Sequence, residues 1–111
     1  MSERRVITRA WIVDLLPGEV RPRCRFRRRS RRILSFPVQL ELRRDETWRP
    51  FVRYDNAHGF CHRDTIHADG SQEKTPVFYG DANTTFSDAI DDLQPNWRAY
   101  RGRYLKEMND D

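Results

Sequence analysis

Apolar and polar residues alternate most regularly in the middle of the chain. In residues 33–42 the second half is apolar at every other position, which is typical of a strand with one buried face. Pro37 lies inside this segment and lacks a backbone N–H, so it favours an edge position or a bulge. Residues 48–54 form the next strand, and a short polar turn around Asp45 predicts an antiparallel hairpin between the two.

Weaker strand patterns flank this hairpin. In residues 21–27 two apolar side chains alternate with arginines, so the segment reads as a strand with one apolar face. Residues 60–67 form another strand, whose odd- and even-numbered side chains should point to opposite faces of the sheet. An Asp-Gly turn at residues 69–70 follows, and residues 72–77 return as a short strand.

The end of the chain has the period of a helix from about residue 85 to residue 108. Six apolar or aromatic side chains recur at steps of three and four and form one stripe: Phe86, Ile90, Leu93, Trp97, Tyr100 and Tyr104. Pro95 interrupts the pattern, because an interior proline costs about 3 kcal/mol or more. Either the helix kinks at Pro95, or it restarts with Pro95 in a first turn. We expect the stripe to pack against the sheet.

Residues 1–20 show no clear period. Residues 6–16 are mixed, with a short apolar run at residues 11–16 that ends at Pro17-Gly18. This segment fits either a short helix or an edge strand. We therefore expect an N-terminal extension of unassigned structure over residues 1–20, followed by a single α+β domain over residues 21–111. In this domain an antiparallel β-meander of four to five strands packs against the C-terminal helix.

Charge is distributed unevenly over the 111 residues. Residues 1–70 contain 16 Arg, no Lys and 9 acidic residues, whereas residues 71–111 contain 5 basic and 8 acidic residues. A basic front half attracts an anionic partner such as RNA or DNA. The alternative is an ordinary solvated surface. The aromatic content of 12% supplies enough apolar surface for a folded core.

The cysteines and the hydropathy bear on location. The two cysteines, Cys24 and Cys61, lack the density of a secreted disulfide framework, so we expect free thiols in a cytoplasmic protein. The sequence shows neither a signal-peptide pattern nor an apolar run of about 20 residues. We therefore expect no membrane association.

Arginine dominates residues 21–32, where it occupies eight of twelve positions. Such a cluster is typical of a nucleic-acid-binding patch, although arginine-rich stretches also occur as tails. The residues expected to bind nucleic acid are Arg25, Arg27, Arg28, Arg29, Arg31 and Arg32.

Residues 53–70 hold the densest group of side chains able to move protons or bind phosphate. All three histidines, His58, His62 and His67, lie in this segment. Their spacing contains the residue types of a zinc or manganese site. However, His62 and His67 should point to opposite faces of a strand, and Gly59 argues against a helix that would unite His58 with His62. We therefore expect neither a metal nor another cofactor.

The same segment suits RNA cleavage without a metal. Such a reaction needs a base for the ribose hydroxyl, an acid for the leaving oxygen and cations near the phosphate. The expected catalytic residues are His58, His62, Asp55 and Asp64. The expected substrate-binding residues are Arg53, Tyr54, Asn56, Arg63, His67 and Lys74. In the alternative, these side chains only shape turns and form ordinary cross-strand pairs.

One run of residues carries a resemblance to a known family. The run Arg53-Tyr54-Asp55-Asn56-Ala57-His58, followed by His62 and His67, resembles the TumE group of prokaryotic toxin–antitoxin toxins. This resemblance covers residues 53–67, and it departs from the group where Gly59-Phe60-Cys61 replaces further histidines and a proline. Residues 25–105 also resemble a small bacterial and archaeal family of unknown function. Both resemblances imply a compact α+β domain.

From the cluster and the TumE resemblance we expect a toxin-like protein of a toxin–antitoxin system that cleaves RNA and pairs with an antitoxin protein. The alternative is a non-enzymatic module that binds nucleic acid or a protein through the same surface. A third expectation is a homodimer formed through the helix stripe. Loss of the dimer on Trp97→Asp would identify that interface.

Overall fold

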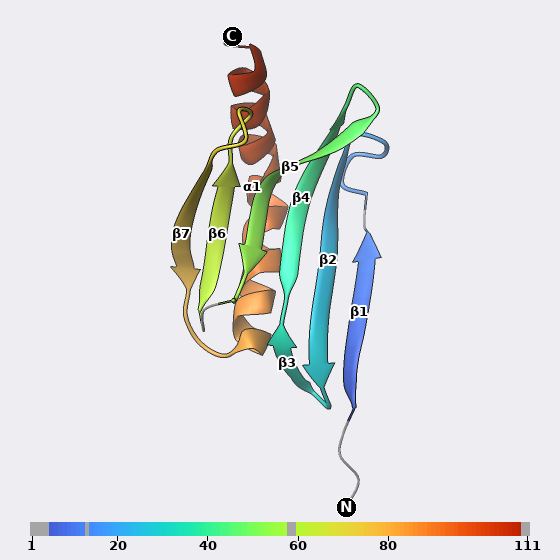
Figure 1. Ribbon diagram of the computed structural model, residues 1–111, viewed down its shortest axis with the longest axis vertical. Helices are drawn as coiled ribbons and strands as arrows, with labels where there is room; N and C mark the ends of the chain where they lie inside the picture. Colours follow the sequence, from blue (N-terminus) through green and yellow to red (C-terminus); the bar gives the residue numbers. More distant parts are fainter. Residues whose placement is uncertain (1–4, 13, 58–59, 110–111) are drawn as a thin grey trace, which may run out of the picture.

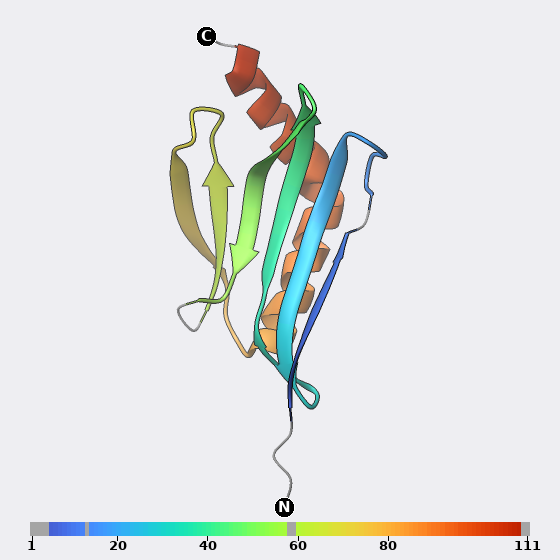
Figure 2. The same cartoon turned by 45° about the vertical axis from the view of Figure 1, so that its right-hand side comes forward.

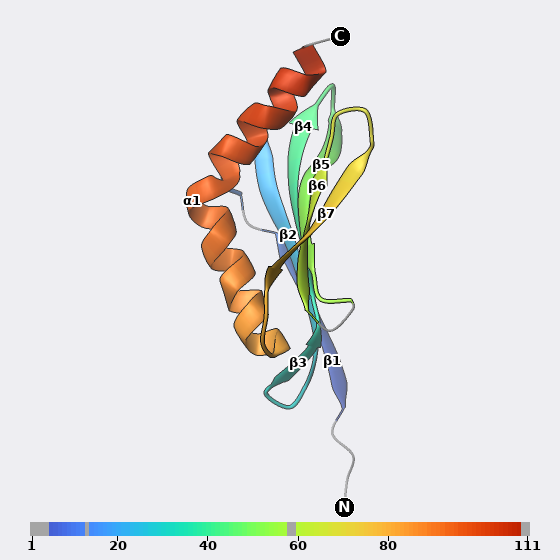
Figure 3. The ribbon, with the colours of Figure 1, turned by 90° about the vertical axis from the view of Figure 1, so that its left-hand side faces the viewer.

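The computed structural model describes residues 5–12, 14–57 and 60–109 and shows an antiparallel sheet with one helix against it (Figure 1). The elements are β1 (Val6–Ile12), β2 (Val20–Arg29), β3 (Arg32–Ser35), β4 (Pro37–Arg44), β5 (Thr47–Asp55), β6 (Cys61–Ile66), β7 (Gln72–Phe78) and α1 (Ala82–Asn109). The α+β meander predicted from the pattern is confirmed, with more strands than the four to five expected. Figures 2 and 3 show α1 lying on one side of the sheet.

The strands follow one another in space as they do along the chain. Their order is β1-β2-β4-β5-β6-β7, and every neighbouring pair is antiparallel. The hairpin of β4 and β5 turns through Asp45 and Glu46, whose φ angles are 53° and 64°. Two successive residues of positive φ are the mark of a type I′ turn, whose twist matches that of the flanking strands.

The strand predicted over residues 33–42 is divided into two. β3 pairs with the end of β2, and β4 begins at Pro37 and pairs with the rest of β2. At the break, the side chain of Asn56 accepts from the backbone N–H of Phe36 (3.0 Å) and donates to the carbonyl of Leu34 (3.3 Å). Pro37 is tolerated in this central strand because it is the strand's first residue.

The N-terminal segment forms an edge strand, which is one of the two structures that its side-chain pattern left open. β1 pairs with β2 from Val6↔Arg29 to Ile12↔Arg23 and forms one edge of the sheet. The ring of Trp11 lies 5.5 Å from that of Phe26. Residues 6–12 are thus part of the sheet, although the side-chain pattern predicts that the domain begins at residue 21.

The core lies between α1 and the face of the sheet that α1 covers. The sheet contributes fully buried side chains such as Val38 and Tyr54, and the helix contributes Leu93, Trp97 and Tyr104. The predicted stripe thus packs against the sheet. The helix is continuous through Pro95, and Figure 3 shows it bent near its middle, as expected where a proline removes a hydrogen bond.

Two side chains fix the N-terminus of α1, one just before the helix and one in its first turn. The carboxylate of Asp81 accepts from the backbone N–H of Thr84 (2.8 Å), which is the geometry of an N-cap. Asn83 accepts from the N–H of Ile33 and donates to the carbonyl of Arg31, both at 2.8 Å. In the part of the chain that the structure describes, no helix is long and apolar enough to cross a membrane.

Candidate functional site

The second face of the sheet is covered by no described helix (Figure 3). Along β2 the buried residues Val20, Pro22 and Cys24 point toward α1, so the intervening residues point to the second face. These intervening residues are Arg21, Arg23, Arg25, Arg27 and Arg29. We call this surface, with the residues that continue it on the other strands, the open face.

The register of the strands places a row of polar side chains across the open face. The row runs from β2 to β7 through Arg23, Gln39, Arg53, Asp64 and Lys74. The ammonium of Lys74 lies 3.5 Å from Asp64 Oδ1. An adjacent row pairs Asp55 with His62. Five of the residues predicted to form a site are therefore neighbours on one surface.

A shallow hollow of about 450 Å³ opens on the β1–β2 side of this row. It is lined by Ala10, Trp11, Ile12, Arg23, Cys24, Arg25, Pro37, Gln39 and Arg53. Three arginines and several apolar residues therefore line the same hollow. A hollow with this lining suits a ligand that has both an anionic and an apolar part.

Some of the open-face charge is neutralised within the protein. Glu41, only 3% exposed, is 2.9 Å from Arg21 Nε and 3.5 Å from Arg23 Nη1. The guanidinium of Arg21 also lies 3.9 Å from the centre of the Trp48 ring. Arg53 Nε is 3.6 Å from the carboxylate of Asp55. These pairs fix the arginines nearest to the middle of the sheet.

The remaining arginines of β2 keep their charge available. Arg25, Arg27 and Arg29 form no ion pair or hydrogen bond with any residue that the structure describes. They are exposed and stand at alternate positions of one strand, roughly 7 Å apart. Among the predicted site residues that the structure describes, these three arginines form the largest group of neighbouring charges without an ion pair.

The other predicted nucleic-acid-binding arginines lie elsewhere. Arg28 has the opposite parity from the open-face row, and its guanidinium donates to the carbonyl of Ser30 at 2.7 Å. Arg31 and Arg32 lie in and after the turn between β2 and β3, next to the start of α1. The cluster of residues 21–32 is thus divided between two surfaces.

Tyr54 and Arg63, which were predicted to bind substrate, face the helix. The Tyr54 hydroxyl donates to Asp92 Oδ2, and Arg63 Nη1 is 3.4 Å from the same oxygen. The Tyr100 hydroxyl is 2.9 Å from it and accepts from Arg63 at 3.1 Å. Burial, followed by the bond to Asp92, raises the pKa of Tyr54. This polar network joins α1 to β5 and β6 beneath the sheet.

Asn56 and His67 are also separated from the open-face rows. Asn56 is committed to the junction of β3 and β4 described above. His67 follows β6 at the end opposite His62, roughly 17 Å away along the chain. His58 lies outside the residues that the structure describes.

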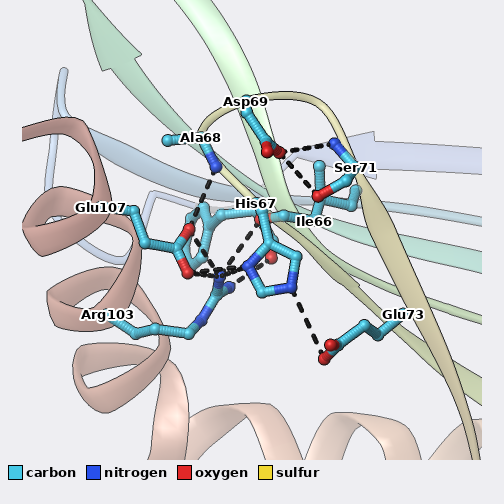
Figure 4. A network of polar contacts seen from close by, with 9 residues as sticks. Ile66, His67, Ala68, Asp69, Ser71, Glu73, Arg103 and Glu107 are labelled. Atoms are coloured by element: carbon cyan, nitrogen blue, oxygen red, sulfur yellow. Dashed lines mark hydrogen bonds and ion pairs between the residues drawn. The ribbon is translucent and has the colours of Figure 1, made fainter. Parts of the chain in front are cut away.

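Figure 4 shows the surroundings of His67. Its Nδ1 is 2.7 Å from Glu107 Oε2, and its Nε2 is 3.5 Å from Glu73. Arg103 bonds to Glu107 and donates to the carbonyl of Phe51 (2.9 Å). The hydrogen bond that the His67 ring donates to Glu107 raises the pKa of His67 above its ordinary value. This group fastens the end of α1 to the β6–β7 hairpin.

The geometry of the open face suits binding better than proton transfer. His62 is 5% exposed and Asp64 is 6% exposed, whereas a general acid or base must reach the reacting atoms of its substrate. Among the described residues, no three His, Cys, Asp or Glu side chains are grouped as a metal site. The chemistry that this surface offers most directly is ionic and bidentate contact with phosphate.

The thiols contribute no nucleophile to this surface. Cys24 and Cys61 are both buried and free. Burial raises the pKa of Cys24 to about 11 and that of Cys61 to about 12. A reactive thiol needs a lowered pKa, so both cysteines serve as small core residues.

Several open-face residues are not among the site residues that the sequence predicts. Arg23 is not in the predicted set, although it is two residues from Arg25 on the same strand and therefore lies on the same face. Gln39 is a polar position of the strand predicted over residues 33–42 and is not among the predicted site residues. Phe60 packs against His62, and Tyr79 packs against Phe60. Neither aromatic residue belongs to the predicted site. The strand register, which gives the neighbours across the sheet, is the information that would have identified these positions.

The fold and the open face together define a class: a small α+β domain whose sheet carries an arginine-rich exposed face. The family model of DUF7718, a domain of unknown function, matches residues 1–110, and the chain belongs to this family. Neither the curated proteins nor the solved structures gave a match. The family match agrees with the expected likeness to a family of unknown function and does not support the likeness to the TumE group.

Proposed function

We propose that the open face binds nucleic acid through the phosphate backbone, with cellular RNA as the natural ligand. The observation that carries the proposal is the row of Arg25, Arg27 and Arg29, which have no partner among the described residues and share one face of one strand. Arginine guanidinium groups recognise phosphate in bidentate geometry and release counterions when they do so. Arg53 and the hollow beside it extend the same surface toward the middle of the sheet.

The experiment is a salt titration of binding to a labelled RNA. The triple variant Arg25→Gln/Arg27→Gln/Arg29→Gln should lose about two units of the slope of log affinity against log salt, at about 0.7 per phosphate contact. At 0.1 M salt this corresponds to about a 100-fold loss of affinity. Because these side chains contact solvent, the fold should be preserved, which circular dichroism checks.

A matched control removes the same charge from the helix. Arg98→Gln/Arg101→Gln/Lys106→Gln takes three positive charges from α1, on the other side of the sheet. Its affinity should fall much less, and its salt slope should stay close to that of the wild type. Equal losses in the two triple variants would show that net charge alone drives binding, and the proposal would fail.

A second candidate is a toxin-like protein that cleaves the bound RNA. The observation that favours it is that Arg53, Asp55, His62 and Asp64 occupy adjacent rows next to the proposed binding surface. Such a protein would act in the cytoplasm and be neutralised by an antitoxin partner. The low exposure of His62 means that a shift of neighbouring side chains has to precede catalysis.

Growth and RNA integrity after induction separate the two candidates. RNA fragmentation and arrest with the wild type, but not with folded His58→Ala/His62→Ala protein, would support cleavage. Intact RNA in cells whose protein binds RNA in vitro would support the binding module.

A further inference from the structure

An aromatic stack stands at the β6–β7 edge of the open face. Tyr79, directly after β7, is 72% exposed, which is unusual for a large aromatic side chain. Its ring is nearly parallel to that of Phe60, with centroids 5.9 Å apart and an interplanar angle of 22°. The Phe60 ring in turn lies 4.3 Å from that of His62. One side of Tyr79 is therefore supported by protein while most of the residue contacts solvent.

The stack lies on the same surface as the arginines. His62 and Asp64 share the open face, because Arg63 between them points to α1. Tyr79 follows β7, and from β7 to β2 there are four strand spacings, roughly 19 Å. An extended strand of a few nucleotides can span this distance. A ligand held by the β2 arginines can thus also reach Tyr79.

We propose that the open face takes single-stranded nucleic acid and that Tyr79 stacks on one of its unpaired bases. The inference rests on the proposed binding of the phosphate backbone by the open face. Bases in a duplex are covered by their neighbours, whereas bases in a single strand offer their faces to aromatic side chains. Because the Phe60 ring, itself packed on His62, supports the Tyr79 ring before a ligand arrives, stacking costs little ordering of the side chain.

The test uses the full chain with a labelled 12-nucleotide oligouridine, a duplex of the same length and an abasic strand of the same length. Tyr79→Ala should weaken binding of the oligouridine by about 5- to 150-fold, the range measured for one stacked base. Its salt slope should be unchanged, because tyrosine carries no charge. Tyr79→Phe should retain most of the affinity, since the ring remains.

The abasic strand and the duplex complete the design. Wild type and Tyr79→Ala should bind the abasic strand equally, and wild type should prefer the oligouridine to the duplex. The inference would be overturned if wild type and Tyr79→Ala bound the oligouridine with affinities within twofold of each other, or if the wild type bound the duplex as tightly as the oligouridine. In either case, a loss of affinity in the Arg25→Gln/Arg27→Gln/Arg29→Gln variant would leave the proposed function in place. Absence of binding to all three probes would overturn both.

Discussion

The polar network beneath the sheet leads to a prediction about stability. Asp92 accepts from Tyr54, Arg63 and Tyr100 through one carboxylate oxygen. Asp92→Ala removes the acceptor and leaves the fully buried Tyr54 hydroxyl without it, at a cost of about 1–3 kcal/mol. The Arg63 side chain is 27% exposed, so water and Tyr100 replace part of what it loses. We expect a total loss of about 3 kcal/mol.

The neighbouring residue provides the control for this prediction. Asp91 is exposed and carries the same side chain on the same helix, so Asp91→Ala should change stability by no more than about 0.5 kcal/mol. Urea unfolding followed by tryptophan fluorescence measures both variants, because Trp97 is buried in the core. Tyr54→Phe combined with Asp92→Ala should show a coupling of about 1–2 kcal/mol.

The outcome also bears on the roles of Tyr54 and Arg63. If Asp92→Ala and Asp91→Ala unfold at the same urea concentration, the network does not stabilise the fold and the reasoning is refuted. If Asp92→Ala is much less stable while the Tyr54→Phe protein binds RNA as the wild type does, Tyr54 braces the helix and does not contact the ligand.

Three further predictions concern the ends of the elements. His67, whose pKa is raised by Glu107, stabilises the fold fully below its unfolded pKa of about 6.5 and loses that contribution as pH rises through the folded value. The stability difference between wild type and His67→Gln should therefore shrink between pH 5.5 and pH 9 in urea unfolding, and a constant difference would contradict the proposed pairing. Asp81→Ala should cost about 1 kcal/mol by loss of the N-cap, and Asp81→Asn much less, as thermal unfolding would show. Asn56→Ala should cost about 1–3 kcal/mol and increase amide exchange at Phe36, whose N–H loses its acceptor; unchanged exchange would contradict this role.

The elements with a strong local period were predictable from the sequence. β5 and β6 match the strands expected over residues 48–54 and 60–67, and α1 contains the expected helix and its buried stripe. β1 was not predictable in this way, since its side chains are largely exposed and it is held by backbone hydrogen bonds to β2. The break before Pro37 depends on Asn56, which lies 20 residues away from its partner Phe36.

The candidate site was predictable in its residue types but only partly in its arrangement. The density of Arg, His and Asp pointed to residues 21–32 and 53–70. Because successive side chains of a strand point to opposite faces of the sheet, the sequence already places Arg63 and Asp64 on different faces, and likewise Arg28 and its two neighbours. Which of its two faces would receive the helix could not be read from β6 alone, because both faces of β6 carry polar and apolar groups.

The sequence by itself determined the class of fold, the helix stripe and the basic character of the first 70 residues, since these follow from local period and composition. Only the tertiary structure decided which polar side chains reach solvent. The helix covers one face of the sheet and binds Tyr54 and Arg63 through Asp92. Strand register then gathers Arg53 and Asp64 with the β2 arginines on the other face. The physical reason is that neighbours across a sheet are set by pairing between segments that are distant in the chain.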